Sequence, residues 1–225
     1  MVRLVLFDID GTLIRTGGAG VQAFGHVCRT LHGVSDAVEK LNFSGRTDYS
    51  IIREFFRLHN IDPTPEAFQN FIDAYVFWLD HMLRVLNGEI CPGVNKFIAD
   101  LHRQKEPPRV GLLTGNVRLG AEIKLRHYSL WEQFEIGAFA CDHEDRNELA
   151  IKARERGSRL LGRELAGDEI LVIGDTPLDV ACGQAINARI LGVGTGHFRP
   201  DELLKLGATW AVEDLRSADP AVLCA

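Results

Sequence analysis

The sequence predicts an α/β fold, a doubly wound parallel sheet with an inserted α-helical domain. Short apolar runs alternate with longer helical patterns along most of the chain, which favours a parallel sheet. One long stretch contains helical patterns alone and interrupts that rhythm. The chain has 225 residues, 46% hydrophobic and 25% charged, so it can bury a core without disulfides or structural metals. We expect a core domain formed by residues 1–15 and 91–225 and a cap domain formed by residues 16–90.

Five short apolar runs predict the strands of the sheet. They are apolar on both faces, as is typical of buried parallel strands. The runs are Val2–Phe7, Val110–Thr114, Ile136–Ala140, Ile170–Ile173 and Ile190–Val193. Helical patterns separate them at Val94–Gln104, Val117–Tyr128, Asn147–Leu161 and Leu178–Ala185. Because a strand, a helix and a parallel strand almost always form a right-handed unit, this order predicts one parallel sheet.

The stretch between residues 16 and 89 shows no convincing strand. Within 68–86, apolar residues recur at three- and four-residue steps, which predicts an amphipathic helix. Two further helices are expected at 19–32 and 48–59. Flexible residues mark both ends of this insertion, namely Thr16-Gly17-Gly18 and Asn87-Gly88. A helical insertion between two flexible joints is typical of a lid over a site.

Composition excludes several classes of protein. Lys and Arg number 25 against 31 Asp and Glu, and a net charge of −6 argues against sequence-independent nucleic-acid binding. No apolar run approaches the roughly 18 residues of a membrane span. The five cysteines are odd in number and form no C-x-x-C pair, which favours reduced thiols in the cytoplasm and disfavours zinc.

Two carboxylates follow the first predicted strand. Asp8 and Asp10 stand two residues apart, and side chains so spaced on an extended chain point to the same side. We expect them to face one point in space, where a divalent cation would relieve their repulsion. Gly11 would permit a sharp turn directly afterwards.

A second group of polar residues follows another predicted strand. Thr114, Gly115 and Asn116 stand just before a predicted helix, whose unpaired N–H groups would suit a phosphate. These three residues are therefore candidates for phosphate binding. Alternatively, Asn116 serves only as the N-cap of that helix.

A third carboxylate site follows the strand at 170–173. Asp175 ends that strand, and Thr176, Pro177 and Asp179 have the spacing of an N-cap, a first helical residue and a capping partner. Capping explains Asp179 and leaves Asp175 without a structural duty.

The segments D-I-D-G-T, L-L-T-G-N and I-G-D-T-P-L-D occur in this order along the chain. Together they resemble the motifs of the haloacid dehalogenase superfamily, in its phosphatase branch, and especially phosphoglycolate phosphatase-like members. The helical insertion also falls where that family places its α-helical cap. The resemblance implies a Rossmannoid core and a Mg²⁺-dependent phosphatase. Such an enzyme hydrolyses a small soluble phosphate monoester through an aspartyl-phosphate intermediate.

The resemblance also implies roles for individual residues. Asp8 is the nucleophile, and Asp10 is the general acid and then the base. Asp8, the main-chain carbonyl of Asp10 and Asp175 hold Mg²⁺, with Asp179 supporting the metal directly or through water. Thr114 and nearby main-chain groups hold the phosphoryl oxygens.

The chain departs from the family pattern at the third motif, which is a lysine usually followed by proline. Arg146 stands in the expected place, at the start of a helix. Lys152 is the other candidate, about 9 Å further along the helix axis. In the cap, Arg46 either points into the active site to bind a distal carboxylate of the substrate or is a surface arginine.

Two alternative functions remain open. A sugar phosphomutase would use the same aspartyl phosphate but pass the phosphoryl group to a second substrate hydroxyl. A phospholigand-binding module would keep the same residues without turnover. Asp10 separates the chain from the dehalogenases, which lack an aspartate at that position. In each case the expected partner is a small phosphate ester.

Overall fold

The computed structural model describes all 225 residues and contains a six-stranded parallel sheet. The strands lie in the order β5-β4-β1-β6-β7-β8. Their bounds are β1 (Leu4–Phe7), β4 (Arg109–Leu113), β5 (Ile136–Ala138), β6 (Ile170–Gly174), β7 (Arg189–Val193) and β8 (Trp210–Val212). Because β1 pairs with β4 on one side and β6 on the other, the strand order reverses beside β1. Ligands bind at such switch points, outside the carboxyl ends of the strands.

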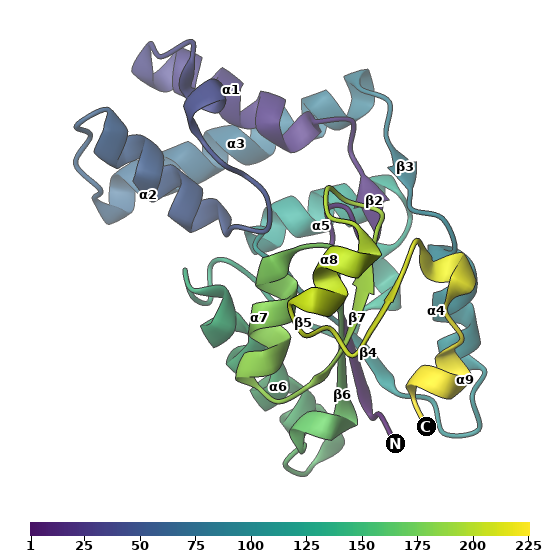
Figure 1. Ribbon diagram of the computed structural model, residues 1–225. Helices are drawn as coiled ribbons and strands as arrows, with labels where there is room; N and C mark the ends of the chain where they lie inside the picture. The colour runs from purple at the N-terminus through teal and green to yellow at the C-terminus, as the bar shows by residue number, and fades with distance from the viewer.

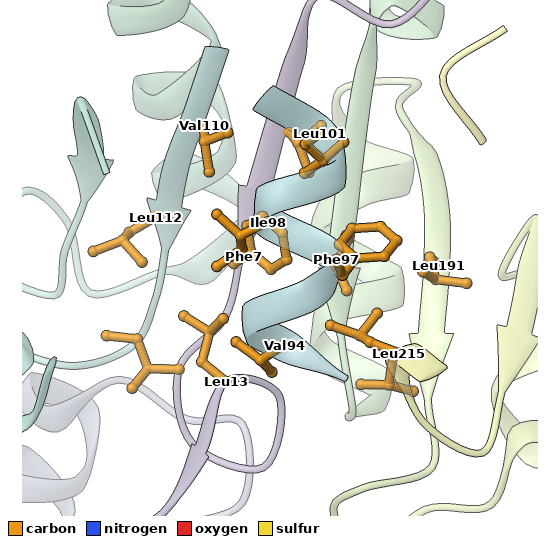
Figure 2. Packing of buried hydrophobic residues seen from close by; sticks show 14 of the residues in the cluster. Phe7, Leu13, Val94, Phe97, Ile98, Leu101, Val110, Leu112, Leu191 and Leu215 are labelled. Atoms are coloured by element: carbon orange, nitrogen blue, oxygen red, sulfur yellow. The ribbon is translucent and has the colours of Figure 1, made fainter. Parts of the chain in front are cut away.

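Helices cover both faces of this sheet (Figure 1). One face carries α4 (Val94–His102), α5 (Arg118–His127) and α9 (Pro220–Leu223), and the other carries α6 (Arg146–Leu161), α7 (Pro177–Ala185) and α8 (Pro200–Lys205). Figure 2 shows Phe7 of β1 packed against α4, with its ring 6.2 Å from that of Phe97. All four residues of β1 are buried, so the core anchors the strand that precedes Asp8.

Three helices form the cap above the carboxyl ends of the strands (Figure 1). They are α1 (Ala19–His32), α2 (Asp48–Leu58) and α3 (Pro65–Val85). They share a separate apolar cluster rich in phenylalanine, including the buried Phe24, Phe55, Phe56 and Phe71. Two short strands, β2 (Ile14–Arg15) and β3 (Glu89–Ile90), pair antiparallel and connect the cap to the core.

The predicted α/β class and the helical insertion are confirmed, and the element boundaries differ by a few residues. The sequence analysis missed β2, β3, β8, α8 and α9, which have two to six residues each and are too short to show a period. Single turns of 3₁₀ helix lie at Ala37–Lys40, Trp131–Gln133, Gly167–Glu169 and Leu215–Ser217. Among the helices, none has the length and apolar character needed to cross a bilayer.

Candidate active site

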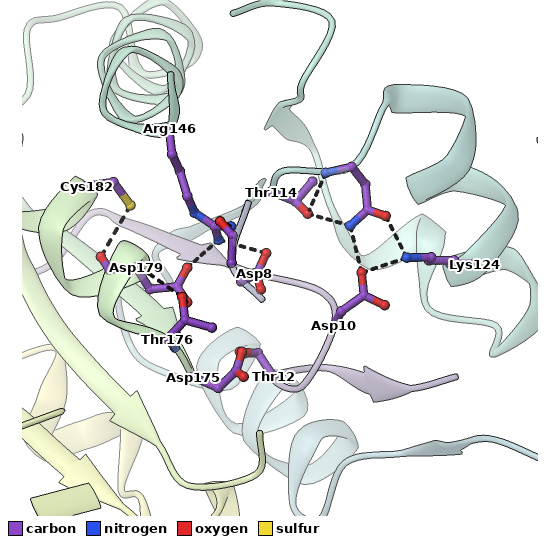
Figure 3. Close-up of polar contacts among 12 residues, drawn as sticks. Asp8, Asp10, Thr12, Thr114, Lys124, Arg146, Asp175, Thr176, Asp179 and Cys182 are labelled. Atoms are coloured by element: carbon purple, nitrogen blue, oxygen red, sulfur yellow. Dashed lines mark hydrogen bonds and ion pairs between the residues drawn. The ribbon is translucent and has the colours of Figure 1, made fainter. Parts of the chain in front are cut away.

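Three buried carboxylates meet at the ends of β1 and β6 (Figure 3). Asp8, Asp175 and Asp179 are 5%, 3% and 1% exposed, and each offers an oxygen within 4.8 Å of the others. The hydroxyl of Thr12 donates to Asp175 Oδ1 at 3.0 Å. A Cβ at Gly196 would lie 1.7 Å from Asp175 Oδ2, so only glycine lets this loop pass the cluster.

Asp10 does not join that cluster. Its Oδ2 instead accepts from Asn116 Nδ2 at 2.8 Å and from Lys124 Nζ at 2.6 Å. Both side chains line the same cavity, but only Asp8 belongs to the carboxylate cluster. β1 ends at Phe7 and the chain bends at Ile9, so strand alternation does not extend to Asp10.

Arg146 brings a positive charge into the carboxylate cluster. It is the first residue of α6, is only 6% exposed, and places Nη2 2.9 Å from Asp8 Oδ1. The same nitrogen donates to Asp179 Oδ1, while Nη1 donates to the carbonyl of Gly45 at 2.8 Å. Lys152 lies outside the cluster, half-exposed and paired with Glu155 at 3.1 Å.

Asp179 has two structural duties. Its Oδ2 accepts from the main-chain N–H of Thr176 at 2.9 Å and from the Thr176 hydroxyl at 2.7 Å, which forms the predicted capping box of α7. Its Oδ1 holds Arg146. The carboxylate therefore fixes both the start of α7 and the guanidinium beside Asp8.

The cluster carries uncompensated negative charge. Burial raises the pKa of Asp8 to about 6, opposed by the nearby Arg146 and reinforced by Asp179 and Asp10. Burial and the charges of Asp179 and Asp8 raise the pKa of Asp175 well above its ordinary value. Three carboxylates against one guanidinium leave two negative charges. A hard divalent cation with oxygen ligands fits both this charge and this donor set.

A cavity of about 490 Å³ lies between the strand ends and the cap. The core lines it with the predicted site residues Asp8, Asp10, Gly115, Asn116, Arg146 and Asp175. The cap lines it with the partly apolar set Val21, Phe24, Phe43, Ile51 and Tyr75. The cavity can therefore hold a molecule that contacts both domains.

Two predicted substrate-binding residues are less accessible than expected. The side chain of Thr114 is fully buried, and its hydroxyl accepts from the Asn116 amide at 2.9 Å. Arg46 lines the cavity, but its guanidinium is paired with Glu54 and donates to the carbonyl of Ser50 at 3.0 Å. Asn116 is not the N-cap of α5, because Val117 occupies that position.

Sequence analysis missed Lys124, which is 3% exposed in α5. A signal was present, because Lys124 follows Val117 and Ala121 at helical spacing and so falls on the buried face of its helix.

The contacts between cap and core beside Asn116 were also missed. The carboxylate of Asp48 accepts from the N–H of Val117 at 2.7 Å, and its own N–H donates to the carbonyl of Gly115 at 2.7 Å. The hydroxyl of Thr47 donates to the carbonyl of Glu144 at 2.7 Å. These bonds hold the start of α2 against the core. No sequence pattern marks them, because they join segments about 70 to 100 residues apart.

The family model of haloacid dehalogenase-like hydrolases matches residues 5–193. The chain belongs to the haloacid dehalogenase-like hydrolase family. The matched span includes the cap, the carboxylate cluster, Arg146 and Lys124. The resemblance inferred from the three motifs is thus confirmed, as is the expectation of an enzyme of the phosphatase type in this family.

Individual relatives agree with this assignment. A protein from Clostridium perfringens (strain 13 / Type A), named as a pyrophosphatase, PpaX, is 24% identical over 202 residues, which cover 86% of this chain and 84% of that protein. CbbY from Rhodobacter sphaeroides, solved in complex with phosphate, has a TM-score of 0.74 and 17% identity over 96% of each chain. β-Phosphoglucomutase from Clostridium difficile has a TM-score of 0.75 and 15% identity over 99% of this chain and 96% of that one. The two structures share the fold.

Proposed function

We propose that this member of the haloacid dehalogenase-like family is a Mg²⁺-dependent phosphatase acting on a small phosphate monoester. The observation that carries the proposal is that two aspartates lining one cavity have different partners. Asp8 is held beside Arg146 and two further carboxylates, whereas Asp10 is held apart by Asn116 and Lys124. A reaction through an aspartyl phosphate needs this separation of a nucleophile from an acid.

In this proposal Asp8 attacks the phosphorus atom. A bond forms between one carboxylate oxygen of Asp8 and phosphorus while the bond between phosphorus and the ester oxygen breaks. Arg146, 2.9 Å from Asp8, would orient the nucleophile and offset charge on the phosphoryl oxygens. Asp8, the main-chain carbonyl of Asp10 and Asp175 would hold Mg²⁺, with Asp179 behind them. When bound, the ion supplies neutralisation of the phosphoryl charge.

Asp10 would act as the general acid in the first half-reaction and as the general base in the second. It would first give a proton to the departing ester oxygen, and then take one from the water that attacks the aspartyl phosphate. Its side chain is 44% exposed and lines the cavity, so an incoming water could reach it.

The substrate would lie between the strand ends and the cap. Gly115 and Asn116 line the cavity next to Asp10, and we assign the phosphoryl group to this side, with Thr114 holding Asn116 in place. The remainder of the ester would face the cap, whose bounds we set at residues 16–90. CbbY has been solved with phosphate and with a xylulose bisphosphate, and PpaX is named as a pyrophosphatase, which favours a small anionic substrate.

A substrate screen tests the proposal. Purified protein is incubated with p-nitrophenyl phosphate, phosphoglycolate, pyrophosphate and hexose phosphates, with Mg²⁺ or with EDTA, and released phosphate is measured. We expect Mg²⁺-dependent release from at least one monoester and none from the Asp8→Asn variant. Interconversion of hexose phosphate isomers without phosphate release would favour a phosphomutase instead. Binding of these compounds without turnover of any kind would favour a phospholigand-binding module.

A further inference from the structure

Lys124 is a buried charge that contacts Asp10 but transfers no proton in the proposed mechanism. Its side chain is 4% exposed, and lysine is almost never buried so completely unless it is paired. The amine lies 2.6 Å from Asp10 Oδ2 and 2.6 Å from Asn116 Oδ1 (Figure 3). It comes from the second turn of α5, so a rigid element of the core carries it toward the cavity.

Lys124, Asn116 and Asp10 form a closed ring of three hydrogen bonds. Lys124 donates to both partners, and Asn116 Nδ2 donates to Asp10 Oδ2 at 2.8 Å. An ammonium group can only donate, so it must face the amide oxygen, which turns the amide nitrogen toward Asp10. Lysine therefore orients the asparagine as well as the carboxylate.

The two carboxylate oxygens of Asp10 differ in their hydrogen bonds. Oδ2 receives both donors, while Oδ1 makes no hydrogen bond within the protein. The carboxylate is thus held by one edge, and its other oxygen is available to a molecule in the cavity.

We propose that Lys124 is a positioning residue, which fixes the Asp10 side chain so that Oδ1 is presented to the leaving-group oxygen. This inference rests on the proposed function, in which Asp10 is the general acid. Lys124 would be the residue that orients the general acid. Two cap helices lie next to this group. A Cβ added at Gly20 of α1 would lie 3.6 Å from the Lys124 amine and 3.4 Å from the Tyr75 hydroxyl of α3.

The test compares two substrates that depend differently on protonation of the leaving group. Nitrophenolate leaves p-nitrophenyl phosphate with little help from an acid, whereas the alkoxide of glycerol 2-phosphate needs a proton. We expect Lys124→Met to lower kcat for glycerol 2-phosphate about 100-fold. For p-nitrophenyl phosphate the same variant should lose less than about 5-fold, because the nucleophile and metal ligands are untouched.

Matched variants separate positioning from a structural role. Lys124→Arg keeps the charge and should recover part of the lost kcat. Lys152→Met removes a half-exposed lysine from α6 and should match the wild type on both substrates. Because Asp10 is 44% exposed and the partly buried Asp48 keeps the N–H of Val117 as a partner, Lys124→Met should fold, which its melting temperature checks. Equal losses on both substrates, or no loss on either, would overturn the proposal.

Crystal structures of wild type and Lys124→Met with Mg²⁺ give a readout that does not require turnover. We expect the Asp10 carboxylate to leave Asn116 in the variant; an unmoved carboxylate overturns the positioning role. If the wild type hydrolyses no ester, the proposed phosphatase function fails, and these structures still decide whether Lys124 sets the position of Asp10.

Discussion

Asp8 and Asp10 are two residues apart in the chain, yet they end in opposite surroundings. Asp8 is 5% exposed and shares a cluster with two other carboxylates and one arginine. Asp10 is half-exposed and receives a lysine and an amide on a single oxygen. Excess negative charge around Asp8 favours a cation, while the donors around Asp10 hold an orientation. Two aspartates of the same chemistry thus differ in role because their neighbours differ.

The largest expected effect comes from removing the charge of Asp8. Asp8→Asn should lower phosphatase kcat by at least about 10⁴-fold, because the nucleophile is lost. Its melting temperature should equal or exceed that of the wild type, since burial penalises the Asp8 charge. Phosphate release and thermal unfolding measure the two effects. Residual activity within 100-fold of wild type would exclude Asp8 as the nucleophile.

Arg146 offers the next largest effect. Arg146→Ala should lower kcat by about 10²- to 10³-fold. It should also lower the free energy of unfolding by about 3 kcal/mol, because it leaves buried carboxylates without their counter-ion. Lys152→Ala is the matched control on the same helix and should change neither quantity appreciably. Similar small effects of both substitutions would remove Arg146 from the site.

Metal and pH should act together on the Asp8 side of the cavity. The pKa of Asp8 is raised from 3.8 to about 6, so in metal-free protein its contribution to stability is fully present below pH 4 and is lost as the pH rises through 6. The loss amounts to about 3 kcal/mol. Mg²⁺ should therefore stabilise the protein more at pH 7.5 than at pH 5. Urea unfolding with Mg²⁺ or EDTA at both pH values measures this, and an equal shift at the two would refute it.

The smallest expected effect concerns the contact between cap and core on the Asp10 side. Burial raises the pKa of Asp48 to about 6, with Lys124 opposing that shift. The wild type should therefore lose stability as the pH rises from 4 through 6, and Asp48→Asn should avoid this part of the loss. An asparagine oxygen can still accept from the N–H of Val117. The Asp48 side chain is only partly buried, so solvent screens much of this effect, and we expect the variant to melt about 2 °C higher at pH 7.5 and equally at pH 4. A lower melting temperature at pH 7.5 would show that the charge stabilises the contact.

The sequence predicted the fold better than it predicted the site. Five core strands and seven long helices follow from apolar runs and helical periods, which are local signals. The capping box at Thr176 and Asp179 follows from three-residue spacing. By contrast, the ring at Asp10 joins β1 to α5 across more than 100 residues. Strand alternation, which ends at Phe7, does not indicate that Asp10 pairs with Asn116 and Lys124.

Local patterns along the chain predicted the order of five core strands and seven helices, the place of the helical insertion and the acids at two strand ends. These depend on periodicity, turn residues and short spacing, which act between near neighbours in the chain. Which charges meet depends on the folded arrangement of the elements. Arg146 reaches Asp8, and Lys124 reaches Asp10, because the parallel sheet brings α6 and α5 to the edge where β1 ends. A charge takes its role from the groups that surround it in space, and the chain fixes those groups only when it folds.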